Sequence, residues 1–270
     1  VAVHADGAAC IDEKNPAAHK NKRLRGIFVA KIGVFSEKMI IFAYQQCEIM
    51  ETTYRRYPIG IQNFEDLRNN NCVYIDKTEL IYRLTHSDKI YFLSRPRRFG
   101  KSLLVSTLEA YFQGKKHLFE GLAMERLETE WAEYPVFHID FNGDNFTKAG
   151  VLEEKIVGAI ETWEAEYGRD PYKQALGDRF IYVLAQAARK YGRRSVVLID
   201  EYDKPLLDVL DTGFSTIVDG EKRLLEDHHR NILKGFYSVF KGADEHLQFV
   251  LLTGVTKFSQ VSVFLSLIHI

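Results

Sequence analysis

Apolar residues in this chain gather in four short runs, separated by longer stretches with helical spacing. Three of the runs contain no charged residue, which is typical of strands buried on both faces of a sheet, and the fourth alternates around His138. The predicted strands are 90–93, 136–141, 196–199 and 249–252. The predicted helices are 102–112, 151–167, 172–191 and 221–241.

Strands that alternate with helices predict a mostly parallel sheet flanked by helices on both faces. Right-handed crossovers place the carboxyl ends of parallel strands at one edge, where such folds bind their ligands. The sequence therefore predicts a three-layer α/β fold with its chemistry at that edge. Before the first strand, Asp76 and Glu79 have the spacing of a capping box, which predicts a helix start.

The first part of the chain differs from the rest. Residues 1–26 are rich in Ala, Lys, Arg and Asn and show no sustained periodicity. We therefore expect residues 1–50 to be a poorly ordered N-terminal extension and residues 51–270 to form the folded domain. With 46% hydrophobic and 27% charged residues, the chain of 270 residues has the composition of a soluble globular protein.

Charge and cysteine content narrow the expected surroundings. The net charge of -1 gives no general support for direct nucleic-acid contact or for an anionic membrane. The three cysteines, Cys10, Cys47 and Cys72, are widely spaced and lack metal-ligand spacing, which fits a reducing cytoplasm. Charged residues interrupt the early apolar stretches before they reach the roughly 20 residues of a membrane span. We therefore expect a cytoplasmic protein that does not enter the membrane.

The first predicted strand runs into a basic turn that ends in Gly100-Lys101-Ser102 and continues as a helix. A phosphate-binding turn needs backbone amides that point into a concavity and the N-terminus of a helix behind them. Gly100 would let the backbone approach a phosphate, Lys101 would contact the β- and γ-phosphates, and the Ser102 hydroxyl would bind Mg²⁺. The segment therefore predicts a phosphate loop.

The loop departs from the usual pattern, because Arg95 stands where the first glycine is expected and Arg98 where many such loops carry another glycine. One alternative is a surface helix cap with a solvated basic run. Another is a nucleic-acid contact through Arg95, Arg97, Arg98 and Lys101, although four cations around one turn suit a polyphosphate equally well. The strand before the turn and the helix after it favour the phosphate loop.

Two carboxylates, Asp200 and Glu201, follow the apolar strand 196–199. Asp200 is the expected Mg²⁺ ligand, and Glu201 is the expected general base for the attacking water.

Thr253 ends a strand that we expect between the other two, where it could contact the γ-phosphate or hold the water. A plain polar strand end is an equally good interpretation of Thr253, and His138 is best explained as a core histidine with satisfied hydrogen bonds. The sequence has no Asn-Lys-x-Asp motif for guanine, which argues against a GTPase.

Six segments, including the string Arg95-Pro96-Arg97-Arg98-Phe99-Gly100-Lys101-Ser102, give the chain a family resemblance. Between residues 57 and 264, it resembles the bacterial AAA-ATPase-like proteins, a P-loop group often fused to a C-terminal nuclease-like domain of the PD-(D/E)xK type. The matching segments are 57–64, 73–78, 92–104, 118–122, 199–205 and 252–259.

The resemblance implies an ASCE-type, AAA-like P-loop fold and ATP as the ligand. It explains Arg95, since members of this family carry arginine where other P-loops carry the first glycine. It also implies a Walker-B-like role for Asp200 and Glu201. We therefore expect the nucleotide to contact the loop residues Arg95, Pro96, Arg97, Arg98, Phe99, Gly100, Lys101, Ser102 and Leu103.

The two ends of the chain depart from the family pattern. Members start just before the segment at Tyr57, which leaves residues 1–49 as an upstream extension. After Val263 and Phe264 the family continues with a Ser-Gly-Leu-Asn-like stretch, whereas this chain reads differently over 265–270. The resemblance therefore implies a C-terminal truncation, without the last core strand and without the nuclease-like domain.

These observations together predict a domain that binds and hydrolyses ATP with Mg²⁺, using Lys101, Glu201 and Thr253 in catalysis and Ser102 and Asp200 for the metal. The expected partners are ATP, further copies of the chain in a homo-oligomer, and a nuclease-like domain in the full-length protein. One alternative is a non-catalytic nucleotide-binding or interaction module in a defence or nucleic-acid-linked assembly. Another is a phosphotransferase that moves the γ-phosphate to a small molecule.

Overall fold

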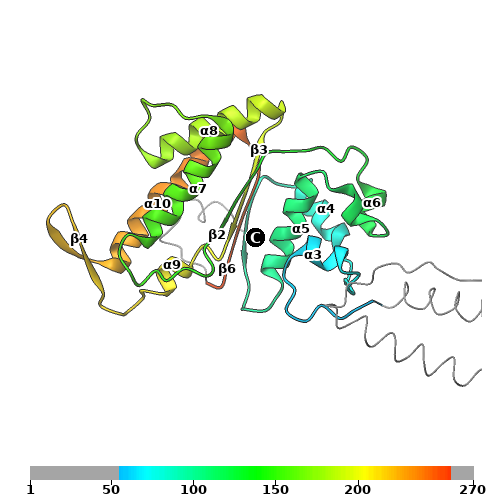
Figure 1. Cartoon of the computed structure of the whole chain (residues 1–270), viewed down its shortest axis with the longest axis horizontal. Coiled ribbons are helices and arrows are strands. Elements are labelled where there is room, and N and C mark those ends of the chain that lie inside the picture. The colour runs from blue at the N-terminus through cyan, green and yellow to red at the C-terminus, as the bar shows by residue number, and fades with distance from the viewer. Residues whose placement is uncertain (1–54, 257–270) are drawn as a thin grey trace, which may run out of the picture. The chain divides into compact units, whose positions relative to one another are not determined.

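The computed structural model describes residues 55–256. A four-stranded parallel sheet in the order β1-β6-β3-β2 forms the middle layer (Figure 1). Its strands are β1 (Ile90–Ser94), β6 (Leu247–Gly254), β3 (Ser195–Asp200) and β2 (Val136–Asp140). As predicted, the strand that carries Thr253 lies between the strand before the phosphate loop and the strand that ends in Asp200.

Helices cover both faces of the sheet, which confirms the three-layer prediction (Figure 1). The first face is covered by α5 (Lys101–Phe112), with α3 (Phe64–Asn69), α4 (Thr78–Thr85) and α6 (Ala123–Leu127) around it. The second face is covered by α7 (Val151–Tyr167), α8 (Leu176–Tyr191) and α10 (Leu225–Gly242). The shorter elements are η1 (Lys116–Phe119), α9 (Lys204–Leu207), β4 (Ser215–Val218), β5 (Glu221–Leu224) and η2 (Asp244–His246).

The alternation of side chains along each strand divides the core into two clusters. On β3, Val196 and Leu198 pack with Leu108 of α5, whereas Val197 and Ile199 pack with residues of α8 and α10 such as Phe180. Asp200 continues the alternation of Val196 and Leu198. It therefore lies on the face covered by α5, at the carboxyl edge of the sheet.

The strand register aligns the carboxyl ends. Asp140 pairs with Asp200, and Ser94 pairs with Gly254. Because β6 runs parallel to both of its neighbours, Thr253 and Asp200 end at the same edge and on the same face. The fold therefore gathers the predicted site residues from three separate parts of the sequence.

The helix predicted at 221–241 begins at Leu225, four residues later than expected. Residues Glu221–Leu224 instead form β5, which pairs with β4 in an antiparallel hairpin. Its two-residue turn has positive φ at Asp219 (54°) and Gly220 (82°), as an Asp-Gly hairpin turn requires. The Asp-Gly pair was the sequence signal for this hairpin.

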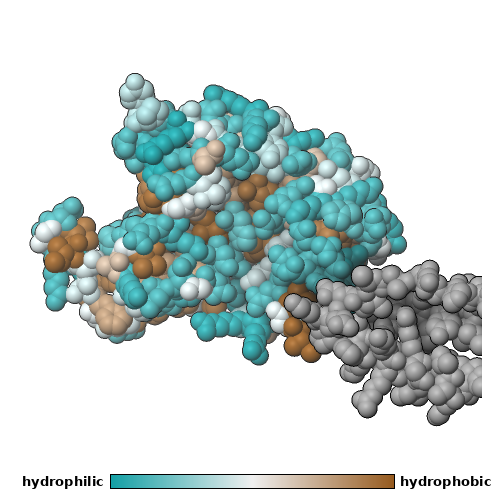
Figure 2. Space-filling view, viewed as in Figure 1, coloured by the Kyte–Doolittle hydropathy of each residue, from teal (hydrophilic) through white to brown (hydrophobic). Residues whose placement is uncertain are grey.

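The hairpin carries exposed apolar side chains, including Phe214 and Leu224 at its base and Ile217, which is 76% exposed. Figure 2 shows apolar surface at the end of the hairpin. Among the described helices, every one is too short or too polar to cross a bilayer.

The helix start predicted at Asp76 and Glu79 is confirmed, but only the Asp76 half of the predicted capping box forms. Thr78 begins α4 after Lys77, which provides no side-chain cap. The Asp76 carboxylate accepts hydrogen bonds from the Thr78 amide at 2.8 Å and the Ala123 amide at 2.7 Å. Glu79 forms an ion pair with Arg83 one turn later. Asp76 therefore caps the start of its own helix and also joins it to the start of α6.

Candidate active site

The loop between β1 and α5 has the backbone shape of a phosphate-binding turn. Gly100, which precedes α5, has φ of +73°, and the Leu104 amide donates to its carbonyl to close the first helical turn at 3.0 Å. Arg98 also has a positive φ, +67°, a region that L-residues seldom occupy. The conformation that makes glycine common at this position in other loops is therefore kept here by an arginine.

The predicted lysine and the predicted acidic pair lie together at the carboxyl edge. The buried Lys101 ammonium is 3.1 Å from Glu201 Oε1 and donates to the Arg95 carbonyl at 3.2 Å. Only 4% of the Lys101 side chain and 19% of the Glu201 side chain are exposed. The ion pair therefore joins the start of α5 directly to the end of β3.

The part of the loop before Lys101 faces solvent, whereas Ser102 and Leu103 are partly buried in the first turn of α5. The side chains of Arg95, Arg97 and Arg98 make no ion pair or hydrogen bond with any residue from 55 to 256. The loop residues with exposed side chains are Arg95, Pro96, Arg97, Arg98 and Phe99.

Asp200 is held in a fixed orientation. Its Oδ1 accepts hydrogen bonds from the Thr253 hydroxyl and, at 3.0 Å, from the Glu201 amide. Both Asp200 and Thr253 are buried. A threonine hydroxyl has one proton, so Thr253 cannot donate to Asp200 and to a γ-phosphate at the same time. In this arrangement Thr253 orients the carboxylate of Asp200.

Glu201 occupies an unusual backbone conformation, with φ of +52° directly after the strand. A non-glycine residue in this region is uncommon, and such residues cluster at functional sites. The next residue is tied to the neighbouring strand, since the Tyr202 amide donates to the Thr253 carbonyl at 2.9 Å. The sharp turn directs the Glu201 side chain toward Lys101.

Asp140 and His138 were not among the predicted site residues, although both lie on the α5 face of β2. Asp140 is exposed next to Asp200 and accepts from the Asn142 amide at 2.7 Å. His138 Nδ1 is 3.1 Å from Glu109 Oε2, and its Nε2 is buried with no hydrogen-bond partner in the described part of the chain. The prediction that His138 is fully satisfied is therefore wrong. The role of Asp140 could have been suspected from the sequence, because an acidic residue ends the strand Val136–Asp140.

The surroundings of His138 change its acidity. Burial of the ring lowers the pKa of His138, but the hydrogen bond and charge of Glu109 and then the charges of Asp140 and Asp200 outweigh burial. The pKa of His138 is therefore raised above its usual value. A cationic imidazole would partly balance the carboxylates at this edge.

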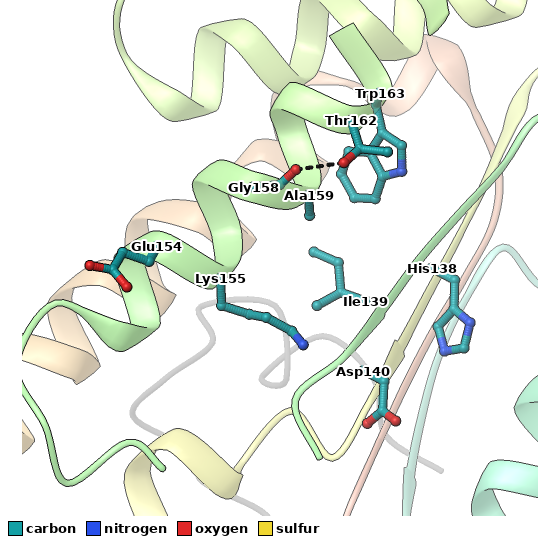
Figure 3. A pocket seen from close by; sticks show the side chains of 9 residues that line it. All are labelled: His138, Ile139, Asp140, Glu154, Lys155, Gly158, Ala159, Thr162 and Trp163. Carbon is teal, nitrogen blue, oxygen red and sulfur yellow. Dashed lines mark hydrogen bonds between the residues drawn. The ribbon is translucent and has the colours of Figure 1, made fainter. Parts of the chain in front are cut away.

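A pocket of about 480 Å³ lies beside these residues, along β2 and α7 (Figure 3). Figure 3 shows Lys155 reaching from α7 across the pocket, and its ammonium pairs with Asp144 at 2.8 Å. The pocket is next to the candidate active site at Asp140. Its lining consists of His138, Ile139, Asp140, Glu154, Lys155, Gly158, Ala159, Thr162 and Trp163.

The site offers oxygen ligands of the kind that Mg²⁺ prefers, namely the Asp200 carboxylate and the Ser102 hydroxyl. No group of three His, Cys, Asp or Glu side chains within residues 55–256 forms a ready metal centre.

The layered sheet, the loop before α5 and the carboxylates after β3 define a fold of the P-loop nucleotide-binding class. The sequence model of one family, described as "Predicted AAA-ATPase", matches residues 58–264. The chain therefore belongs to the AAA-ATPase-like family, as its sequence resemblance indicated.

A curated relative from Azotobacter chroococcum mcd 1, described as "Uncharacterized protein in vnfD 5'region", is 39% identical over 212 residues. The match covers 78% of this chain and 39% of that protein, so the chain spans about two fifths of the relative's length. The fusion to a nuclease-like domain, the truncation, the homo-oligomer and the cytoplasmic location stay predictions. The predictions that residues 1–50 are poorly ordered and that the last core strand is missing concern parts outside the described residues.

Proposed function

We propose that this domain binds ATP together with Mg²⁺ and hydrolyses it. The observation that supports this most directly is the 3.1 Å contact between Lys101 and Glu201, next to Asp200. It brings a cation for phosphates, a carboxylate for the metal and a carboxylate for water to one point of the sheet edge. The first turn of α5 adds free backbone amides and the positive end of a 12-residue helix.

The phosphates would bind at Lys101 and at the amides of the loop. Within residues 55–256 the Lys101 ammonium contacts Glu201 and the Arg95 carbonyl, so an incoming phosphate would compete with the Glu201 carboxylate for it. Once Lys101 turns to the phosphate, Glu201 is released to accept a proton from the attacking water. Arg95, Arg97 and Arg98 are exposed and can add positive charge around the phosphates.

Asp200 and Ser102 would hold the metal. Mg²⁺, when bound, neutralises charge that develops on the phosphate oxygens. Thr253 donates to Asp200 Oδ1, which fixes the carboxylate and leaves its second oxygen as the proposed metal ligand. Roles for Lys101, Glu201, Asp200 and Ser102 therefore agree with hydrolysis more than with simple nucleotide storage.

The proposal is tested by thermal unfolding with and without Mg-ATP. A ligand that binds only the folded state stabilises it by about 2.7 kcal/mol at a hundredfold excess over its dissociation constant. We expect Mg-ATP to raise the unfolding midpoint of the parent and of the control Lys234→Ala, whose lysine lies on an exposed face of α10. Lys101→Ala should show no such rise.

Release of inorganic phosphate distinguishes the hydrolase from the alternatives. A stabilised parent that never releases phosphate would favour the non-catalytic nucleotide-binding module. If the parent shows neither stabilisation by Mg-ATP nor phosphate release, the proposal as a whole is refuted.

A second candidate function is transfer of the γ-phosphate to a small molecule. The pocket beside Asp140 favours it, because it could hold a small-molecule acceptor next to the strand end that pairs with Asp200. This candidate predicts that ADP forms only when an acceptor is added and that no free phosphate appears. A parent that releases phosphate steadily from ATP and water alone would exclude it.

A further inference from the structure

Asp203 is a fully buried carboxylate that the proposed mechanism does not use. It lies two residues after Glu201, at the start of α9. Its Oδ2 accepts three hydrogen bonds, from the Val255 amide at 2.9 Å, the Thr256 amide at 2.6 Å and the Thr256 hydroxyl at 2.7 Å. A charged acceptor strengthens each of these bonds. Asp203 therefore binds the segment that follows β6.

The same segment also holds the start of the phosphate loop. The Arg95 amide donates to the Gly254 carbonyl at 3.0 Å, and the Ser94 hydroxyl donates to the Val255 carbonyl at 2.9 Å. Residues 254–256 consequently lie between two parts of the candidate active site. One part is the loop that would bind phosphates, and the other is the turn that carries Glu201.

The approach of these parts is close enough to require a glycine. A Cβ added at Gly254 would lie 2.5 Å from Asp203 Oδ1 and 2.6 Å from the Tyr202 ring. Tyr202 adds a further link, since its hydroxyl donates to the Thr256 carbonyl at 2.9 Å. Asp203 Oδ1 itself has no hydrogen-bond partner in the described residues. The Asp203 carboxylate is thus kept buried although only one of its oxygens is satisfied.

We propose that Asp203 is a positioning residue for ATP hydrolysis, which holds the end of β6 against the Glu201 turn and so sets where the phosphate loop stands relative to the acidic pair. The inference rests on the proposed ATPase function. Nucleotide affinity comes mainly from contacts within the loop and α5. Hydrolysis needs in addition that Glu201 and Asp200 are aligned with a phosphate bound to that loop, and such alignment is sensitive to small displacements.

The test compares Asp203→Asn with the matched control Asp208→Asn. Asp208 is also an acidic residue of the α9 region, and its carboxylate bonds with Lys204 and with the Phe146 amide instead of residues 254–256. Calorimetric titration with ADP gives the affinity and the fraction of competent sites, and steady-state phosphate release gives kcat per competent site. We expect Asp203→Asn to lower this kcat about 10- to 100-fold, with a much smaller change in ADP affinity. Asp208→Asn should keep the parental kcat per site.

A merely structural role for Asp203 gives a different pattern. The unfolding midpoint and the fraction of competent sites would fall, while kcat per competent site stayed at the parental value, and this result would overturn the inference. A parent that neither binds nor hydrolyses ATP would overturn the proposed function first, and the inference with it.

A milder variant keeps the test decisive if Asp203→Asn does not fold. Thr256→Val removes the hydroxyl donor and leaves both backbone amides of the contact in place. We expect a smaller decrease of kcat per competent site in the same direction. An unchanged kcat per site in Thr256→Val, when Asp203→Asn is unfolded, would count against the positioning role.

Discussion

Two buried ion pairs in this domain differ in how completely their charges are satisfied. Arg179 of α8 and Glu164 of α7 form two parallel hydrogen bonds of 2.8 Å each, and both side chains are less than a tenth exposed. Lys101 and Glu201 share a single contact of 3.1 Å at the sheet edge. The first pair has the bidentate geometry that favours rigidity. The second pair has one contact, and the backbone of Glu201 has a positive φ. This agrees with our proposal that Lys101 exchanges Glu201 for a ligand.

The acidity of Glu164 agrees with this contrast. The hydrogen bonds from Arg179 lower the pKa of Glu164 below its usual value, against the opposing effect of burial. The charged form of Glu164 is therefore stabilised by Arg179 of the neighbouring helix. The comparison therefore separates a pair that stabilises the packing of α7 on α8 from the pair for which we propose a role in catalysis.

The largest expected effect is on catalysis. Glu201→Gln removes the proposed base and should lower kcat by roughly 10²- to 10⁴-fold, as the loss of a general base does. ADP affinity should not fall, because Lys101 loses a competing carboxylate. Phosphate release and calorimetric titration measure the two quantities, with Glu245→Gln, an exposed side chain of η2, as control. Parental turnover in Glu201→Gln would remove Glu201 from the mechanism.

The next effect is on stability and concerns the other pair. Glu164→Ala removes both hydrogen bonds that the buried Arg179 guanidinium donates to Glu164, which should destabilise the fold by about 3–5 kcal/mol in urea unfolding. The exposed neighbour Glu161, 3.9 Å from Arg179, is the control, and Glu161→Gln should cost less than about 1 kcal/mol.

Turnover per folded molecule should stay unchanged in Glu164→Ala, because the pair lies away from the sheet edge. The double variant Glu164→Leu with Arg179→Met should recover most of the stability, since it removes both charges together. A large loss of kcat per folded molecule in Glu164→Ala would contradict the division into a structural and a chemical pair.

The smallest expected effect concerns His138. Glu109→Gln removes the carboxylate that holds the imidazolium, so the pKa of His138 should fall, as NMR titration of the ring would show. A raised folded pKa contributes stability that is present below the unfolded value near 6.5 and is lost as the pH rises through the folded pKa. Glu109→Gln should therefore destabilise the domain more at acidic than at alkaline pH. An equal loss at both would show that the pair carries no ionic contribution.

Much of the fold could be predicted from local pattern. Uninterrupted apolar runs at Val196–Ile199 and around Leu251 predicted buried parallel strands, because only a strand covered on both faces tolerates so few polar residues. The hairpin at Asp219-Gly220 was missed, since the helical pattern of α10 was extended across a turn signal. The helix start at Thr78 was predicted, but the link from Asp76 to Ala123 was not, because these residues are 47 positions apart in the sequence.

The candidate site was predictable in its parts and not in its connections. Gly100-Lys101-Ser102 and Asp200-Glu201 carry their chemistry in residue type and spacing, so a single sequence sufficed to single them out. The hydrogen bond from Thr253 to Asp200 and the three bonds to Asp203 join segments that are about 50 residues apart in the sequence. No local sequence pattern indicates from which donor such a carboxylate will accept a hydrogen bond.

The sequence by itself determined the alternation of strands and helices, the P-loop class and the residues that we propose for phosphate, metal and base chemistry, because these depend on side-chain type and on spacing within one element. Only the tertiary structure decided that Lys101 contacts Glu201, that the Thr253 hydroxyl donates a hydrogen bond to Asp200, and that Asp203 binds the end of β6 to the turn after β3. Those contacts follow from strand order and register, which bring separate segments to one edge of the sheet. The physical reason is that a buried charge takes the partners that packing supplies, whatever their distance along the chain.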